Sequence, residues 1–332
     1  HHVFAGGWLW VSPFNNHARA TNPLCSVGLM LDPRIHPPQP ELTPEAEFRA
    51  FIARYPDIER QFASAQAVRP WTRTGRIQYS SKRVVGDRFA LLGHAAGFID
   101  PLFSQGLSVS MMSTCLLAHL LLEAKGTGDY SAAAFQPLEE STLAYIRSND
   151  RLIANSYKAF GDYRLWSVYA ILWLVGAYTE LVKLSSVRVQ ARNRQEYHTQ
   201  ARCLKLVGGG FDEFDAVAAR LDAIMEKVDL GDEAAVVAAA AEMQAILEGV
   251  AWLPKPFLEV LHGKNHLPEN KLRPGLLTPN AGFLGHGAYR EHFFGSRSMA
   301  DVVQAFVGEK LRYSERAIRR RQSQARPPMA RA

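Results

Sequence analysis

The sequence predicts an α+β fold, in which a strand-rich N-terminal part precedes a mostly helical C-terminal part. Residues 1–31 and 66–92 contain apolar and aromatic runs bounded by Pro, Gly and Asn, which is typical of strands. From about Tyr130 onward the chain is predicted to be almost entirely helical. The 332 residues suggest about two domains, and a composition of 47% apolar and 21% charged residues is typical of a globular protein.

The N-terminal region is predicted to contain two strands and an interrupted helix. The first strand runs from Val3 to Phe14 and the second from Cys25 to Leu31, each closed by prolines. A proline-rich linker follows. Residues 45–65 then show helical spacing of apolar side chains, broken at Pro56.

A short apolar strand and a long helix are expected in the middle of the chain. Phe89–Leu92 is the strand, and it runs into a group of small residues. The helix begins near Gly106 and continues to about Ala124, where Lys125-Gly126 is a typical helix end.

The C-terminal part contains an apolar helix and a helix pair. Residues 165–179 are uncharged, but they are fewer than the roughly 20 residues that a bilayer span needs, so a buried or grooved helix is favoured over membrane contact. Apolar residues at alternating steps of three and four predict an antiparallel pair over 214–228 and 236–250. Residues 262–296 are rich in Gly, Pro, Asn and His and are predicted to be loops.

Charge and cysteine usage narrow the class of protein. The net charge is +6, and the arginines of the last residues are interpreted as a flexible basic tail over 321–332 rather than a nucleic-acid arm. The three cysteines, Cys25, Cys115 and Cys203, lie far apart and predict no disulfide framework. Without a recognisable signal peptide, these features favour a cytoplasmic location.

Motifs for metal, acyl-transfer and phosphate chemistry are weak or missing. His262 and His266 are four residues apart, but Gly263, Asn265 and Pro268 disfavour the helix that would align them, so no metal site is predicted. The sequence contains no Gly-x-Ser-x-Gly and no Gly-x-x-x-x-Gly-Lys.

The most informative segment runs from Gly86 to Leu107. Small residues over 93–97 let a ligand approach the main chain closely. A loop containing Pro101 then leads into a helix whose first amides have no internal partners and lie at the positive end of the helix dipole. Such a helix start can bind an anion or the electron-rich edge of a ring. An ordinary strand–turn–helix connection is the alternative interpretation of the same residues.

This segment resembles the second flavin-binding motif of flavoprotein hydroxylases and halogenases, and it is most similar to that of flavin-dependent halogenases. Their pattern of Phe, Pro, Ser and Gly is matched by Phe98, Pro101, Ser104 and Gly106. Their Trp-x-Trp-x-x-Pro signature is matched in Gly7–Pro13. The resemblance covers residues 1 to about 125 well and the helical remainder loosely.

The resemblance implies three sets of site residues. The FAD-contacting set is Gly93, His94, Ala95, Ala96, Pro101, Gly106 and Leu107. The halide-binding set is Ser104, Gln105 and Gly106, and the set that separates flavin from substrate is Trp8, Trp10, Pro13, Phe98 and Phe103. Because residues two apart on a strand face the same way, Trp8 and Trp10 are expected to form one aromatic wall.

Several positions depart from the family pattern. His94 stands where an Asp is expected to hold the flavin ribityl hydroxyls, and a neutral His can make one such hydrogen bond without carrying a negative charge. Phe103 replaces the Glu of tryptophan halogenases, which favours a phenol or pyrrole substrate. The Gly-x-Gly-x-x-Gly motif and the reactive lysine that follows it in the family are not found, so no catalytic residue is assigned and a truncated chain is the simplest account.

The predicted domains follow from this resemblance. Residues 1–82 would form part of a substrate-binding sheet, and residues 83–125 would be the last strand and helix of an FAD-binding domain. Residues 126–320 would form a helical domain, and 321–332 would form the tail.

The implied activity is halogenation of an electron-rich aromatic compound, either free or tethered to a carrier, using reduced FAD, O2 and a halide. A separate flavin reductase would supply the reduced FAD. Two alternatives remain open from the sequence: a flavin monooxygenase or geranylgeranyl-reductase-like enzyme, and a non-catalytic helical binding or scaffold protein.

Overall fold

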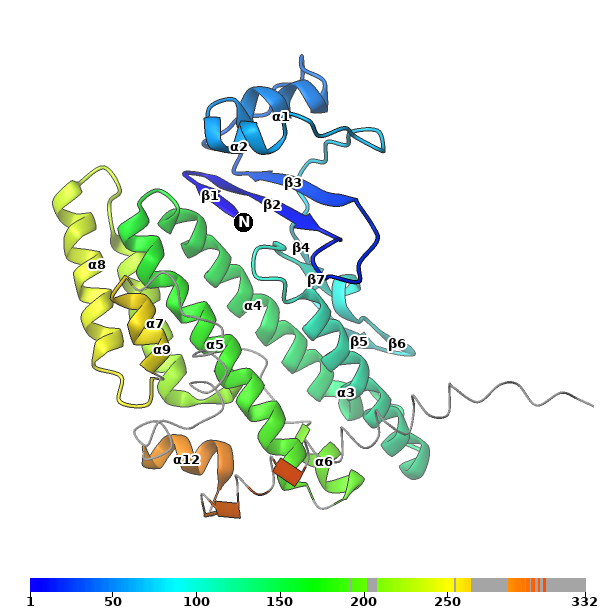
Figure 1. Cartoon of the computed structure of the whole chain (residues 1–332). Helices are drawn as coiled ribbons and strands as arrows, with labels where there is room; N and C mark the ends of the chain where they lie inside the picture. The colour runs from blue at the N-terminus through cyan, green and yellow to red at the C-terminus, as the bar shows by residue number, and fades with distance from the viewer. Residues whose placement is uncertain are drawn as a thin grey trace, which may run out of the picture.

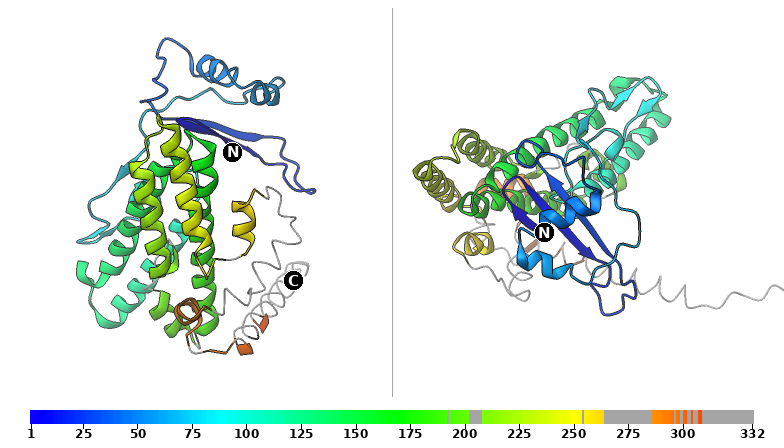
Figure 2. Two further views of the ribbon diagram at one scale, coloured as in Figure 1. Left: turned by 90° about the vertical axis from the view of Figure 1, so that its left-hand side faces the viewer. Right: turned by 90° about the horizontal axis from the view of Figure 1, so that it is seen from above.

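The computed structural model describes residues 1–191, 193–201, 208–253, 255–263 and 286–295, with a few single positions between 297 and 308. A small sheet lies between one pair of short helices and a larger helical body (Figures 1 and 2). The mixed fold confirms the predicted fold class. The predicted tail at 321–332 and Cys203 lie outside the described residues.

The N-terminal sheet has three antiparallel strands in the order β1-β2-β3, formed by His2–Phe4, Gly7–Pro13 and Cys25–Leu31. The single first strand predicted over Val3–Phe14 is wrong. Gly6 has a φ of 76°, so the chain turns there and folds β1 back onto β2. The strand predicted over Cys25–Leu31 is confirmed.

Strand β2 contributes to two separate hydrophobic clusters. Trp8 packs into the large cluster of the helical body, whereas Leu9 packs with Phe4 and the apolar side chains of two short helices. These helices, α1 (Pro44–Ile52) and α2 (Pro56–Gln61), cover the other face of the sheet (Figure 1). Their separation confirms the interruption predicted at Pro56.

The segment before the long helix is folded into very short elements. Tyr79–Ser80 (β4) pairs with Gly97–Phe98 (β7), and Val85–Gly86 (β5) pairs with Phe89–Ala90 (β6). Gly93–Ala95 forms a 3-10 turn, η1. The apolar strand predicted over Phe89–Leu92 is therefore only two residues long, because β6 closes a tight hairpin with β5 and the small residues turn immediately afterwards.

Helix α3 (Gly106–Thr127) begins where the sequence predicts and ends at Gly128, which has a left-handed φ of 78°. It leaves apolar side chains exposed along one face, among them Leu107, Met111 and Leu122. Length and composition alone would allow two helical stretches to cross a membrane: α3, with 28% of its most apolar window buried, and residues Tyr163–Arg188, with 44%. Core helices share this property, so it gives only weak support for a membrane span.

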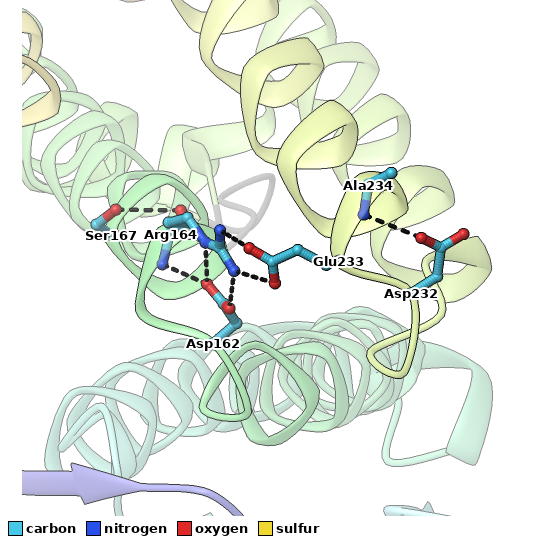
Figure 3. Close-up of polar contacts among 6 residues, drawn as sticks. All are labelled: Asp162, Arg164, Ser167, Asp232, Glu233 and Ala234. Atoms are coloured by element: carbon cyan, nitrogen blue, oxygen red, sulfur yellow. Dashed lines mark hydrogen bonds and ion pairs between the residues drawn. The ribbon is translucent and has the colours of Figure 1, made fainter.

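The helical body is built on two long helices that follow the 3-10 turn η2 (Ala132–Phe135). Helix α4 (Gln136–Ala159) and helix α5 (Tyr163–Gln190) pack against each other. Asp162 caps α5 by accepting a hydrogen bond from the Arg164 amide, and Arg164 also forms an ion pair with Glu233 at the start of α8, as Figure 3 shows. The uncharged stretch 165–179 lies wholly within α5, where Leu165 and Tyr169 are fully buried.

The predicted antiparallel pair is confirmed as α7 (Asp212–Lys227) and α8 (Glu233–Glu248), which pack together. The remaining described elements are α6 (Arg194–Ala201), the 3-10 turn η3 (Gly208–Gly210), α9 (Lys255–Leu261) and α12 (Gly287–Phe294). The prediction of loops over 262–296 is wrong at α12, where Tyr289 and Phe293 are fully buried and hold the helix against the body.

A buried carboxylate on α7 joins the three helices of the body. Asp222, which is 5% exposed, accepts hydrogen bonds from Tyr169 Oη at 2.6 Å and from Asn155 Nδ2 at 3.0 Å. Arg151 Nε lies 2.6 Å from its other oxygen. Two neutral donors and one cation therefore compensate the burial of this charge.

Asp222→Ala is expected to lower the free energy of unfolding by about 3 kcal/mol, because it leaves buried donors on α4 and α5 without an acceptor. Chemical denaturation measures the change. Glu226→Ala removes an exposed carboxylate from the same helix and serves as the control. Equal effects of the two substitutions would contradict the structural role of Asp222.

A second carboxyl group in the body has no such compensation from the part of the chain that the structure describes. Glu180 lies on α5 directly after the uncharged stretch, and burial raises its pKa to about 7. The charged form of this side chain is therefore disfavoured in the folded chain.

Glu180→Gln is expected to stabilise the protein above pH 7 and to have little effect near pH 4. Between the ordinary pKa of 4.5 and about 7, the folded state keeps a proton that the unfolded state loses, so stability falls as pH rises through this window. The gain above pH 7 should be about 2 kcal/mol. Thermal unfolding from pH 4 to 8 tests this, with the exposed Glu242→Gln as the control; the same effect at every pH would contradict it.

Candidate functional site

A cavity of about 230 Å³ lies at the N-terminal end of α3. It is bounded by η1, by the loop that follows β7, by the first turn of α3 and by one face of α4. Its lining residues are Gly93, His94, Gly97, Phe98, Ile99, Asp100, Pro101, Ser104, Gly106, Leu107, Val109, Thr142, Tyr145, Ile146 and Asn149. The motif residues near the start of α3 and the residues of α4, which follows later in the sequence, therefore line the same cavity.

The first turn of α3 offers free amides to this cavity. The side chain of the N-cap residue Gln105 accepts no hydrogen bond from the first amides of α3. These amides therefore lack the acceptor that an N-cap side chain usually provides. The Oε1 atom of Gln105 is buried and has no hydrogen-bond partner among the described residues. The helix dipole adds a partial positive charge at this end. A small anion or an electron-rich ring edge matches these donors.

Gly106 lies close beneath the side chain of His94. A Cβ atom there would lie 2.7 Å from His94 Nε2, which is too close for non-bonded atoms. The exposed His94 ring also packs edge-on against Phe98, with ring centroids 4.9 Å apart. The imidazole that replaces the expected Asp is thus placed directly over the helix start.

The loop before α3 holds one residue in an unfavourable backbone conformation. Ser104 has a φ of 54°, in the left-handed region that residues with a Cβ rarely adopt. Its amide donates to the Pro101 carbonyl at 2.9 Å, so a tight turn imposes this conformation. Strain of this kind costs about 1 kcal/mol or more and is concentrated at functional sites.

Trp8 and Trp10 form one aromatic surface, as their spacing predicts. Their ring centroids are 5.5 Å apart, and the Trp10 ring covers Gly28 on the neighbouring strand so closely that no side chain fits there. Trp8 is 1% exposed and packs in the same cluster as Ile99 and Leu102 of the loop. The wall therefore lies behind the loop rather than in the cavity.

The predicted site residues divide into two groups. Those that line the cavity are Gly93, His94, Phe98, Pro101, Ser104, Gly106 and Leu107. Those that do not line it are Trp8, Trp10, Pro13, Ala95, Ala96, Phe103 and Gln105. Ala96 is fully buried beneath η1, whereas Phe103 stacks on Trp173 of α5 with ring centroids 5.0 Å apart.

Sequence reasoning missed the face contributed by α4. Thr142, Tyr145, Ile146 and Asn149 follow the helical spacing i, i+3, i+4 and i+7, and all four line the cavity. Thr142 and Asn149 are only 3% and 5% exposed, and both line the cavity. A polar pair on the buried stripe of an amphipathic helix was the signal that could have identified this face.

The described residues contain no group of metal-binding side chains. His262 Nε2 lies 2.9 Å from a carboxylate oxygen of Glu248, so it is engaged in a surface contact. His266 lies outside the described residues.

No family model matches the chain. Tetracycline 7-halogenase from Kitasatospora aureofaciens is 47% identical over 173 residues, which are 52% of this chain and 31% of the relative. Monodechloroaminopyrrolnitrin halogenase PrnC from Pseudomonas fluorescens is 46% identical over 194 residues, which are 58% of this chain and 34% of the relative. The crystal structure of halogenase PltM in complex with phloroglucinol and FAD superposes with a TM-score of 0.73 at 31% identity, covering 78% of this chain and 53% of that one.

The chain is related to the flavin-dependent halogenases. Sequence and fold agree on this relationship, and the resemblance carried by the two motifs is confirmed. The chain spans about a third of the length of the two curated halogenases and about half of PltM. The cavity at the start of α3 contains the Phe, Pro, Ser and Gly positions that the halogenase motif shares.

Thr142→Val is expected to weaken ligand binding at the cavity without weakening the fold. The substitution replaces a hydroxyl that lines the cavity with a methyl group of similar size, so stability should stay unchanged or rise by about 0.5 kcal/mol. Thermal unfolding of the intact protein with and without FAD, the ligand found with PltM, measures both effects.

The FAD-induced rise in Tm should be smaller for Thr142→Val than for the wild type. Thr179→Val is the control, because this equally buried hydroxyl donates to the Val175 carbonyl within α5 and lines no part of the cavity. A destabilised Thr142→Val with an unchanged FAD effect would show that Thr142 is only structural.

Proposed function

We propose that the intact protein is an FAD-dependent halogenase that acts on an electron-rich aromatic substrate. The observation that carries this proposal is the combination of the cavity at the start of α3 with the Trp8–Trp10 wall directly behind its loop. Its relationship to halogenases supports the chemistry.

The residues present fit part of FAD. Small residues and the Gly106 main chain allow a flat ring to approach the first turn of α3, and the helix dipole favours negative charge on a reduced ring. The cavity is smaller than the roughly 300–1,000 Å³ usual for small-molecule sites, so it suits the ring but not the whole dinucleotide. We expect His94 to provide a single polar contact to the ribityl chain.

The halide is proposed to lie beside the free amides of Gln105 and Gly106, with Ser104 shaping the turn that presents them. When bound, reduced FAD with O2 supplies the oxidising equivalent that converts the halide into hypohalous acid. The aromatic wall keeps the substrate apart from the flavin. The electrophilic halogen then replaces an aromatic hydrogen, which leaves as a proton.

We expect a phenol or pyrrole substrate, either free or held by a carrier protein, and a separate flavin reductase as partner. Phe103 supports this substrate class, because its stacking on Trp173 fills the position of the tryptophan halogenase Glu with an apolar ring. We also expect a cytoplasmic location. The reactive lysine of the family has no assigned counterpart in this chain.

The alternatives have less support. The Trp pair and the halogenase relatives argue against a flavin monooxygenase or a geranylgeranyl-reductase-like enzyme. A scaffold protein would not need a strained Ser104, the close approach of His94 to Gly106 and the buried polar side chains of Thr142 and Asn149 around one cavity.

The deciding experiment begins with the genomic sequence immediately upstream of His1. An in-frame Gly-x-Gly-x-x-Gly followed by a lysine would support the proposal. The intact protein is then assayed with a flavin reductase, FAD, O2 and either chloride or bromide on phenol and pyrrole substrates. We expect halide-dependent halogenated product, and Trp10→Phe should lower its yield roughly tenfold by opening the wall.

A stop codon with a genuine start near His1, or no halogenated product from the intact protein, would favour the scaffold interpretation. Unchanged halogenation by Trp10→Phe would be consistent with the proposed activity but would contradict the role proposed for the aromatic wall.

A further inference from the structure

A chain of hydrogen bonds connects the aromatic wall to the loop of the cavity. Trp8 Nε1 donates to Tyr157 Oη at 3.1 Å, and Tyr157 Oη donates to Asp100 Oδ2 at 2.8 Å. The other carboxylate oxygen of Asp100 accepts from the Leu102 amide at 2.8 Å. These residues belong to β2, to the loop and to α4, which are far apart in the sequence.

The two ends of this series of hydrogen bonds are buried, Tyr157 between them is half-buried, and none of the three side chains is positively charged. Trp8 is 1% exposed and Asp100 is 8% exposed. Burial raises the pKa of Asp100, while the hydrogen bonds from Tyr157, Leu102 and Trp8 oppose that shift. Burial beside this carboxyl also raises the pKa of the Tyr157 hydroxyl, which therefore stays protonated and able to donate.

Tyr157 is the hydroxyl that contacts both Trp8 and Asp100. Its hydroxyl has one proton, which it gives to Asp100, and one occupied acceptor position, which takes the proton of Trp8. Asp100 lines the cavity directly after Phe98 and Ile99, whereas Trp8 forms the wall behind it. One hydroxyl therefore connects the wall to the loop that shapes the proposed halide site.

We propose that Tyr157 is a positioning residue for halogenation, holding Trp8 and Asp100 in register so that oxidised halide passes to the substrate rather than escaping to solvent. This role rests on the proposed halogenase function. Tyr157 touches neither substrate nor cofactor and acts through its two neighbours. The known halogenase motifs cover the β2 and loop positions, whereas Tyr157 lies on α4, outside both.

The test compares Tyr157→Phe with the wild type in the intact protein. The aromatic ring stays, but the hydroxyl that accepts from Trp8 and donates to Asp100 is removed. We measure halogenated product per flavin oxidised, and free oxidised halide with a small chlorination acceptor added to the solution. Tyr157→Phe should lower the halogenated product per flavin oxidised roughly tenfold. It should also raise the amount of oxidised halide captured by the added acceptor. Reduced flavin free in solution also reacts with O2, so product per flavin oxidised falls when less enzyme is folded. Trapped oxidised halide per halogenated product comes only from folded enzyme, so a rise in this second ratio distinguishes a positioning defect from a loss of folded protein.

Ser156→Ala is the matched control, because it removes a fully buried hydroxyl from the adjacent position of α4 that donates only within its own helix. Its product ratio should stay within about twofold of the wild type. Asp100→Asn keeps an acceptor for Tyr157 and should fall between the wild type and Tyr157→Phe. If Ser156→Ala lowers the ratio as much as Tyr157→Phe does, the proposal is overturned.

A second readout needs no activity. In ¹⁵N spectra, the Trp8 indole resonance is assigned by its loss in Trp8→Phe. Tyr157→Phe should shift this resonance and speed its exchange with solvent, while Ser156→Ala should not. An unmoved resonance, or a moved resonance with an unchanged product ratio, would overturn the proposal. No halogenation by the wild type would instead overturn the proposed function and the role that rests on it, while the indole resonance would still report the contact.

Discussion

The alternation of side chains along β2 is the constraint on which the rest of the structure depends. Trp8 and Leu9 are both almost fully buried, yet they point to opposite faces of the strand and enter two different hydrophobic clusters. A shift of the β2–β3 register by one residue would expose both clusters. The same pleat that joins the sheet to the helical body therefore also places the aromatic wall against the loop of the cavity.

The cavity depends on main-chain conformation as much as on side chains. Gly6 folds β1 onto β2, and the left-handed Ser104 turns the loop into the first residues of α3. The His94 ring lies close over Gly106 at that helix start. Local geometry thus produces donors without acceptors, which is the physical requirement for holding a small anion.

Buried polar groups connect the separate parts of the molecule. Asp222 joins the helices of the body through donors on α4 and α5, and Asp100 joins the loop to α4 and the sheet through Tyr157. The two carboxylates differ in one respect, since Arg151 contacts Asp222 and the contacts found for Asp100 are neutral donors. Helix α4 takes part in both networks and also lines the cavity. The position of this cavity wall therefore depends on how α4 packs in the helical body.

The sequence by itself determined the elements whose signals are local. Periodicity predicted α7 and α8, the prolines predicted the break between α1 and α2, and the motif residues predicted where α3 begins and which way Trp8 and Trp10 face. The departures from the family pattern at His94 and Phe103 were also visible in the sequence. Local spacing failed at the β1–β2 turn and at α12, where a positive φ and long-range burial decided the structure.

The residues that complete the site from distant parts of the sequence are brought together by helix packing. Thr142 and Asn149 reach the cavity because α4 packs beside α3, and Tyr157 meets Asp100 across 57 positions of sequence. Helical spacing shows that such residues share a face, but it does not show what that face will contact. The contact is determined by the packing of whole helices. Many apolar side chains contribute to the packing energy, so no single sequence motif predicts it.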